Sequence, residues 1–244
     1  MFDVKDKSFR KDLMHVIKKL KRKERFAFSK YADGELHILS NKPINNGEFW
    51  FEPEQDQDHR QKIIDSLRFK NDNYFVGIAC PCCIGGSTVH SWYKKQSGQD
   101  IENLTWANLF VNGNYSYYMN NMVPLYSEYK VVLVSNSDSS LDRLPFEIEK
   151  HFKIGKNAWV DDYNLIDEMK KYITNEHIEG RLFLFCAGPF GNILGHQLFQ
   201  HNQENTYIDI GSTLNHFLLG ENGKNRGYLR GESSARKICT WGDK

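Results

Sequence analysis

The strongest constraint on how this chain folds is a pair of short apolar runs, Val131-Val-Leu-Val134 and Leu182-Phe-Leu-Phe185. Short runs without a polar residue are typical of strands covered on both faces by helices. Similar strand-like segments alternate with helix-like segments along the chain. This alternation predicts an α/β fold, a Rossmann-like and largely parallel sheet with helices on both faces.

Predicted strands and helices alternate along almost the whole chain. Strands are predicted at 25–30, 74–80, 105–111, 130–135, 157–160, 181–186 and 206–210. Helices are predicted at 5–23, 54–69, 114–124, 141–151, 162–177, 188–201 and 212–219, with one more opening at Gly85-Gly86. Residues 40–58, which hold the aromatic cluster Phe49-Trp50-Phe51, are predicted to be an irregular loop. Ligands of open α/β sheets bind beyond the carboxyl ends of the strands, so the loops there are where we expect a site.

The chain divides into three predicted parts. Residues 1–24 form a basic amphipathic helix, residues 25–219 the main domain, and residues 220–244 a basic loop and tail that packs on the same domain. The first helix repeats apolar residues at helical spacing, at Phe9, Leu13, Val16, Ile17 and Leu20. A docked helix with a solvated basic face explains this pattern. Peripheral contact of residues 5–23 with an anionic membrane surface is the alternative.

Composition gives no support to a nucleic-acid-binding, disulfide-rich or membrane-spanning protein. A formal net charge of +1 gives no indication of nucleic-acid binding. Five cysteines, three of them crowded at Cys80, Cys82 and Cys83, do not form the pattern of a disulfide framework and favour the reducing cytoplasm. The residues after Met1 are charged, unlike a signal peptide, and no apolar run approaches the roughly 20 residues that span a bilayer. A cytoplasmic protein is therefore expected.

The cysteine cluster invites a zinc interpretation, which the sequence does not favour. A closed zinc site needs four ligands, usually as two separated pairs, whereas Cys186 and Cys239 are single and distant along the chain. Structural cysteines at a strand end are the expectation.

Asp33-Gly34-Glu35 directly follows the first predicted strand. Two carboxylates one residue apart can converge on a hard cation such as Mg²⁺ or Mn²⁺, which prefers oxygen ligands and often shares them with substrate phosphates. Lys30, three residues before Asp33, could meet a diphosphate from the other side. By spacing alone, an exposed turn and a surface lysine explain these residues more economically.

Two further segments follow late strands. Gly188-Pro189-Phe-Gly191-Asn192 opens a helix, where backbone N–H groups and the helix dipole favour phosphate, although the glycines suit close helix packing equally well. Asp209 ends the last strand among apolar residues, just before Gly211-Ser212. It is a candidate general base or ribose ligand, with a helix cap as the alternative.

Phe28-Ser-Lys30-Tyr-Ala-Asp33-Gly-Glu35-Leu resembles the nucleotide-sugar site of GT-D type glycosyltransferases, whose Asp-x-Glu motif binds a divalent cation. Other segments are similar to that family in the same order. They are Lys130–Ser135, Lys156-Asn157-Ala158-Trp159, Leu182–Pro189 and Tyr207–Gly211. Lys30 stands where the family has arginine, and Gly211-Ser212 where many members have Gly-His, so that histidine's role cannot be transferred.

The resemblance implies a metal-dependent transfer of sugar from a nucleotide-diphosphate sugar, with a UDP-sugar first among the donors, to a glycan, glycolipid or glycoprotein acceptor. Asp33 and Glu35 would hold Mn²⁺ or Mg²⁺. Lys30, Arg226 and the turns at Gly188-Pro189, Gly191-Asn192 and Gly211-Ser212 would contact the donor. Asp209 is the first choice of base and Asp138 the second. A non-catalytic nucleotide- or sugar-binding module is the alternative, followed by an S-adenosylmethionine-dependent methyltransferase.

Overall fold

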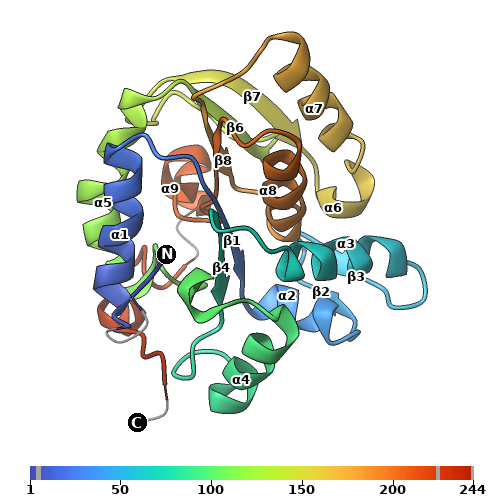
Figure 1. The fold of residues 1–244 in the computed structure, drawn as a ribbon, viewed down its shortest axis with the longest axis vertical. Helices are drawn as coiled ribbons and strands as arrows, with labels where there is room; N and C mark the ends of the chain where they lie inside the picture. Colours follow the sequence, from blue (N-terminus) through green and yellow to red (C-terminus); the bar gives the residue numbers. More distant parts are fainter. Residues whose placement is uncertain (4–6, 224–225, 243–244) are drawn as a thin grey trace.

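The computed structural model describes residues 1–3, 7–223 and 226–242. Within these residues one parallel sheet of seven strands runs through the molecule in the order β5-β4-β1-β9-β8-β6-β7 (Figure 1). The strands are β1 (Ala27–Tyr31), β4 (Tyr74–Ile78), β5 (Leu104–Trp106), β6 (Val131–Asn136), β7 (Ile148–Ile154), β8 (Leu182–Phe185) and β9 (Thr206–Asp209). The predicted α/β class and parallel sheet are confirmed.

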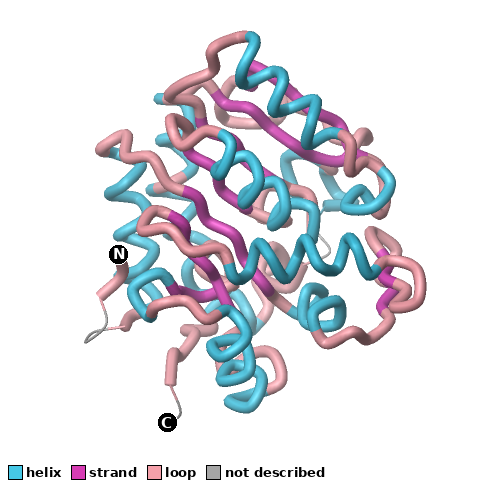
Figure 2. The backbone as a smooth tube through the Cα atoms, turned by 45° about the vertical axis from the view of Figure 1, so that its right-hand side comes forward, coloured by secondary structure: helices cyan, strands magenta, loops and turns pink. Residues whose placement is uncertain are grey.

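Alternate strand residues face opposite sides of the sheet, and helices cover both (Figures 1 and 2). The apolar runs behave as predicted: Val132 and Val134 enter one core, and Val131 and Leu133 the other. The first core packs against α2 (Asp33–Leu39), α3 (Gln57–Arg68), α4 (Gly86–Ser97), α6 (Ala158–Asp161), α7 (Leu165–Asn175) and α8 (Pro189–His201). The second packs against α1 (Phe9–Lys21), α5 (Tyr115–Asn121) and α9 (Asn215–Leu218).

The first helix is docked as expected. Its five predicted apolar residues are all buried in the second core, while Met14 on the other face is 48% exposed. Residues 5 and 6 of the predicted helix lie outside the described residues. In the described part of the chain, no helix combines the length and apolar character needed to cross a bilayer.

Two neighbouring predictions are wrong. The segment predicted as a helix at 141–151 forms a turn and then β7, and the strand predicted at 157–160 is the short helix α6. β7 is an edge strand that buries Phe152 and Ile154 but exposes the charged residues Glu149, Lys150 and Lys153. This mixture obscures the period-two pattern. Asn157 takes a left-handed conformation, φ 49°, and ends the extended chain before α6.

Smaller differences concern element ends. The strand predicted at 105–111 is the shorter β5, Leu104–Trp106, and the helix predicted at 212–219 is reduced to Asn215–Leu218. Asp33-Gly34-Glu35 is not a free turn, because it forms the first turn of α2. The predicted irregular loop contains a short antiparallel pair, β2 (Ile44–Asn45) and β3 (Trp50–Phe51).

The docking of α1 can be tested with adjacent residues. Leu13 is fully buried and Met14 is largely exposed in the same helix. We expect Leu13→Ala to lower the free energy of unfolding by about 2–5 kcal/mol, because it leaves a cavity in the core. Met14→Ala should change it by less than about 0.5 kcal/mol. Urea unfolding of both variants measures the difference, and equal effects would contradict the docked helix.

Candidate functional site

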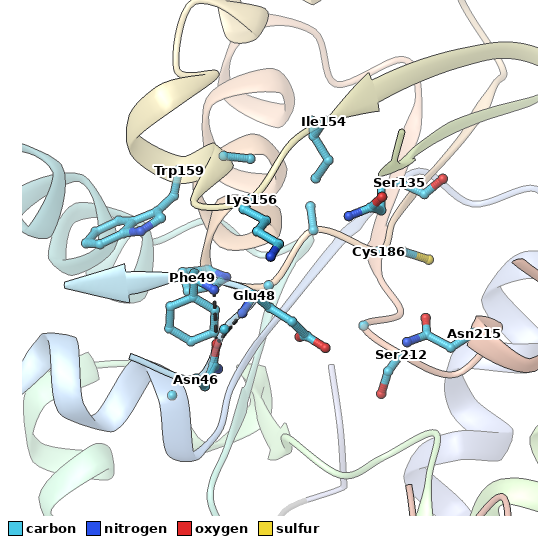
Figure 3. Close-up of a pocket in the computed structure, with 18 of the residues that line it drawn as sticks. Asn46, Glu48, Phe49, Ser135, Ile154, Lys156, Trp159, Cys186, Ser212 and Asn215 are labelled. Atoms are coloured by element: carbon cyan, nitrogen blue, oxygen red, sulfur yellow. Dashed lines mark hydrogen bonds between the residues drawn. The ribbon is translucent and has the colours of Figure 1, made fainter. Parts of the chain in front are cut away.

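A cavity of about 620 Å³ lies at the carboxyl ends of the parallel strands (Figure 3). This volume is in the usual range of small-molecule sites. Its walls come from the segments after β1, β6, β7, β8 and β9, together with the loop between β2 and β3. Of the residues predicted for the site, the cavity is lined by Lys30, Asp33, Glu35, Asp138, Gly188, Pro189, Gly211, Ser212 and Arg226. A smaller cavity of about 180 Å³ adjoins it and shares Lys30, Asp33, Ser212 and Arg226.

The carboxylates of the Asp-Gly-Glu segment differ in their surroundings. Asp33 is exposed in the cavity wall, whereas Glu35 is 5% exposed. One oxygen of Glu35, Oε2, accepts a hydrogen bond from the Ala32 N–H at 2.8 Å and so caps α2. Gly34 between them packs against Phe49, where any Cβ would approach the ring to 2.6 Å. The segment thus brings two carboxylates to the cavity and holds the aromatic loop beside them.

Lys30 is a partly buried cation surrounded by acids. Burial alone would lower the pKa of its ammonium group, but the charges of Asp209, Glu35 and Asp33 raise it above the ordinary value. The end of the Lys30 side chain lies across Gly211, where a Cβ would come within 2.5 Å of Lys30 Cε. Gly211 has φ +52°, a left-handed conformation that favours glycine, whereas the flexible end of Lys30 could move to make room for a Cβ.

Asp209 lies below the cavity and is absent from its described lining. It is 1% exposed, and its Oδ1 accepts a hydrogen bond from Gly211 N–H at 3.0 Å. Among the described atoms Oδ2 has no hydrogen-bond partner. Burial raises the pKa of Asp209 to about 6, although Lys30 works in the opposite direction. Asp209 is therefore placed to fix Lys30 from beneath.

The start of α8 contributes less to the cavity than predicted. Gly188 and Pro189 line it, but Gly191 and Asn192 do not appear in the described lining. Pro189 has no N–H, and the N–H groups of Phe190 and Gly191 already bond to Ala187 and Gly188 carbonyls. Gly191 packs against Asp209, where a Cβ would lie 3.2 Å from its Cγ. The helix dipole points at the cavity, but most nearby donors are occupied.

Asn192 has a structural role that the sequence did not reveal. It is fully buried, and its Nδ2 donates to the Lys30 carbonyl at 2.7 Å. It therefore fastens the end of β1 to α8 and sets the direction in which the chain enters α2.

The opposite wall carries Asp138, the second candidate for the base, together with three residues that the sequence did not single out as site residues. Ser135 and Asn136 end β6, Asp138 follows it, and Lys156 follows β7. Figure 3 shows the Lys156 side chain extending into the cavity above the Glu48–Phe49 segment. Because the sequence predicted a helix at 141–151, the residue after the true strand was not recognised as a strand-end residue.

The loop over the cavity is held by Asn157. Its Oδ1 accepts hydrogen bonds from Trp50 N at 3.0 Å and Trp159 Nε1 at 2.8 Å, and its N–H donates to the Glu48 carbonyl at 2.9 Å. Asn46 in turn accepts from the Glu48 and Phe49 N–H groups (Figure 3). The loop predicted at 40–58 therefore forms an ordered wall of the cavity.

The C-terminal segment reaches the same cavity. Ser212 Oγ lies 2.9 Å from Tyr228 OH, and Arg226 Nη2 lies 3.7 Å from Glu48 Oε2. The Arg226–Glu48 pair links two segments that line the cavity. Both side chains are well exposed, so the pair adds little stability and can open readily. Residues 224–225 of the predicted basic loop lie outside the described residues.

The donor set at this cavity fits Mg²⁺ or Mn²⁺. Hard divalent cations prefer carboxylate oxygens, and Asp33 and Glu35 both line the cavity. One ammonium group, Lys30, is surrounded by the three carboxylates of Asp33, Glu35 and Asp209. With all three ionised, this group carries two excess negative charges, which a divalent cation would balance. Lys30 alone, with a single positive charge, leaves this negative charge unbalanced.

Solved structures with the same fold include two DUF1792 proteins. One, from Streptococcus sanguinis and described as a new glycosyltransferase, has a TM-score of 0.59 and 13% identity over 95% of this chain and 93% of its own. Another, described as having a distinct glycosyltransferase fold, has a TM-score of 0.57 and 15% identity over 91% of this chain and 81% of its own. No protein-family model and no curated protein sequence matches the chain. At these identities the similarity establishes the fold alone.

The buried position of Asp209 predicts a pH effect on stability. Its pKa is raised from 3.8 to about 6, so the folded chain binds this proton more tightly than the unfolded chain. The resulting stabilisation is complete below about pH 4 and is lost as pH rises through about 6, by up to about 3 kcal/mol. Asp209→Asn should lack this loss, so its stability relative to the parent should rise between pH 4 and pH 7.

Urea unfolding at several pH values measures this difference, with the exposed Asp138→Asn as the control. Lys30 stays charged throughout the range, so its own titration does not interfere. A stability difference between Asp209→Asn and the parent that is constant from pH 4 to pH 7 would contradict the buried carboxyl.

Proposed function

We propose that this chain is a glycosyltransferase that takes a sugar from a nucleotide-diphosphate sugar. The observation that carries the proposal is the charge arrangement of the cavity. Carboxylates of Asp33 and Glu35 lie beside Lys30, and the cations Lys156 and Arg226 line the same space. A departing diphosphate is stabilised by positive charge, which Lys30, Lys156 and Arg226 would supply together with a cation held by Asp33 and Glu35.

Two further observations support the proposal. The DUF1792 structures that share the fold are described as glycosyltransferases. The segments that resemble GT-D enzymes are far apart in the sequence, yet all five contribute residues to one cavity. These residues are Lys30 and Ala32–Glu35, Ser135, Lys156 with Ala158 and Trp159, Cys186–Pro189, and Gly211. The resemblance therefore includes residues that line the cavity itself.

Asp33 and Glu35 would hold Mn²⁺ or Mg²⁺ together with the donor diphosphate. When bound, the cation supplies charge stabilisation to the departing nucleotide. Lys30, which lies against Gly211 and near the charge of Asp209, would meet a phosphate oxygen. Lys156 and Arg226 approach from the opposite wall and from the C-terminal segment. Gly188 presents the positive end of the α8 dipole.

We assign the role of base, if the transfer inverts the sugar, to Asp138 rather than Asp209. Asp138 is exposed in the cavity wall, so an acceptor hydroxyl can reach it. Asp209 is buried beneath Lys30 and acts as a positioning residue. A glycan, glycolipid or glycoprotein is the expected class of acceptor. A lipid-linked acceptor would meet α1 by its basic face, because the apolar face is buried.

The test is release of nucleotide from UDP-, GDP-, dTDP- and CMP-sugars with Mn²⁺ or Mg²⁺ and with EDTA. We expect slow hydrolysis of one donor that EDTA abolishes. Asp33→Asn and Glu35→Gln should lower it by about 100-fold or more, the order seen when a group that stabilises developing charge is lost. Lys156→Ala should weaken donor binding, measured by calorimetry. Glu168→Ala, on the exposed face of α7, is the control and should match the parent.

Donor binding without turnover, with every acceptor class tried, would favour a nucleotide-sugar-binding module. If no nucleotide-sugar binds to the folded parent chain in the presence of metal, the proposed function is wrong.

A further inference from the structure

Four cysteines meet at one point away from the cavities. Cys80, Cys82 and Cys83 lie in the turn between β4 and α4, and Cys239 reaches them from the C-terminal tail. Their meeting was not expected from the sequence, because Cys239 comes 156 positions after Cys83. The expectation of purely structural cysteines rested on Cys239 being distant, and the fold removes that distance.

The spacing of the sulfur atoms is that of a tetrahedral metal site. Cys80 and Cys82 Sγ are 3.5 Å apart, Cys82 and Cys83 Sγ 3.9 Å, and Cys83 and Cys239 Sγ 3.8 Å. All four ligand atoms lie within 4.8 Å of one another. Four sulfurs bound to Zn²⁺ at about 2.3 Å in a tetrahedron are about 3.8 Å apart. A disulfide would need about 2.0 Å.

The backbone on both sides holds the thiols in this arrangement. The Cys83 N–H bonds to the Cys80 carbonyl at 3.2 Å, which curls the turn around its sulfurs. The positive φ of Gly85 and Gly86, +64° and +68°, then lets the chain enter α4. Such a tight turn lets three cysteines separated by only one residue, or none, face one centre.

The tail is fixed just as firmly. Gly113 N–H bonds to the Lys237 carbonyl at 2.8 Å, and Trp106 Nε1 donates to the Thr240 carbonyl at 3.0 Å. The Trp241 ring packs 4.9 Å from the Trp106 ring. Cys239 sits between these anchors and is 3% exposed. The protein therefore presents a fourth ligand without a metal having to gather it from solution.

The groups around the sulfurs suit thiolates. Asn112 Nδ2 points at Cys239 Sγ at 3.5 Å, and the Thr240 N–H points at Cys82 Sγ at 3.4 Å. Donors of this kind commonly orient metal-bound ligands and stabilise their charge. Lys237 bonds to the Cys82 carbonyl and places a cation next to the cluster.

A catalytic role fits the cluster less well. None of the four cysteines is among the described residues that line the two cavities, whereas Cys186 is. With four protein ligands in a tetrahedron, no coordination position is left for water or substrate. These features are typical of a structural site.

We propose that Cys80, Cys82, Cys83 and Cys239 bind one Zn²⁺ that ties the C-terminal tail to the turn after β4. Binding displaces the thiol protons and leaves a site with two net negative charges, which Lys237 partly offsets. Cys239 belongs to the same C-terminal segment as Arg226 and Tyr228, which line the two cavities. The zinc site is independent of the reaction proposed above.

The test is elemental analysis of the full chain, purified under reducing conditions without a metal-affinity tag. We expect one zinc per chain. X-ray absorption of the zinc-loaded parent should show four sulfur ligands at about 2.3 Å, without any variant. Cobalt(II) exchanged into the site should give the intense visible absorption of tetrahedral thiolate coordination.

Cys239→Ser and Cys82→Ser should lose the zinc or bind it much more weakly. Cys186→Ser is the matched control, and Asp33→Asn separates this site from the candidate Mg²⁺ or Mn²⁺ site. Both should keep one zinc per chain. A parent chain that neither carries nor takes up zinc, zinc that persists in both cluster variants, coordination by oxygen or nitrogen, or iron in place of zinc would each overturn the proposal.

Discussion

The candidate site depends on the point at which the neighbouring parallel strands β1 and β9 stop pairing. β1 pairs with β4 from Ala27 to Tyr31 but with β9 only at Ala27 and Phe28. Beyond this point the backbone of β1 needs other partners, because buried polar groups are seldom left unpaired. Asn192 supplies one by donating to the Lys30 carbonyl. The parting of the strands gives Lys30 its place over Gly211, with Asp209 below and Glu35 nearby. Burying the ammonium group of Lys30 or the carboxylate of Asp209 alone would cost free energy, and their proximity lowers that cost.

The sequence was informative wherever one physical signal dominated. Central strands buried on both faces have no polar residues to confuse the pattern, so β6 and β8 were predicted nearly to their ends. β7 was missed because an edge strand needs only part of its length buried, and its charged residues imitate an exposed helix. Lys156 was therefore missed as a site residue, since a strand-end residue can be recognised only when the end of the strand is known.

The site was only partly predictable for a related reason. Lys30, Asp33 and Glu35 follow one strand, so local sequence places them together. Whether a side chain faces the cavity or the layer beneath it depends on register and packing. Asp209 and Asn192 thus proved to be buried supports, although their types resemble those of site residues. Asn157 could not be assigned a role at all, because its partners Glu48 and Trp50 lie over 100 residues earlier.

The central place of β9 has a consequence for how the molecule is made. It lies between β1 and β8, yet it is the last of the sheet's seven described strands to be synthesised. A ribosome-bound chain can form the β5-β4-β1 and the β8-β6-β7 halves of the sheet, but it cannot join them until residue 209 has emerged. Until then the edges of β1 and β8 that pair with β9 are open, and an open strand edge is prone to wrong pairing. Assembly of the cavity is therefore a late event, because its floor and Gly211 come with β9.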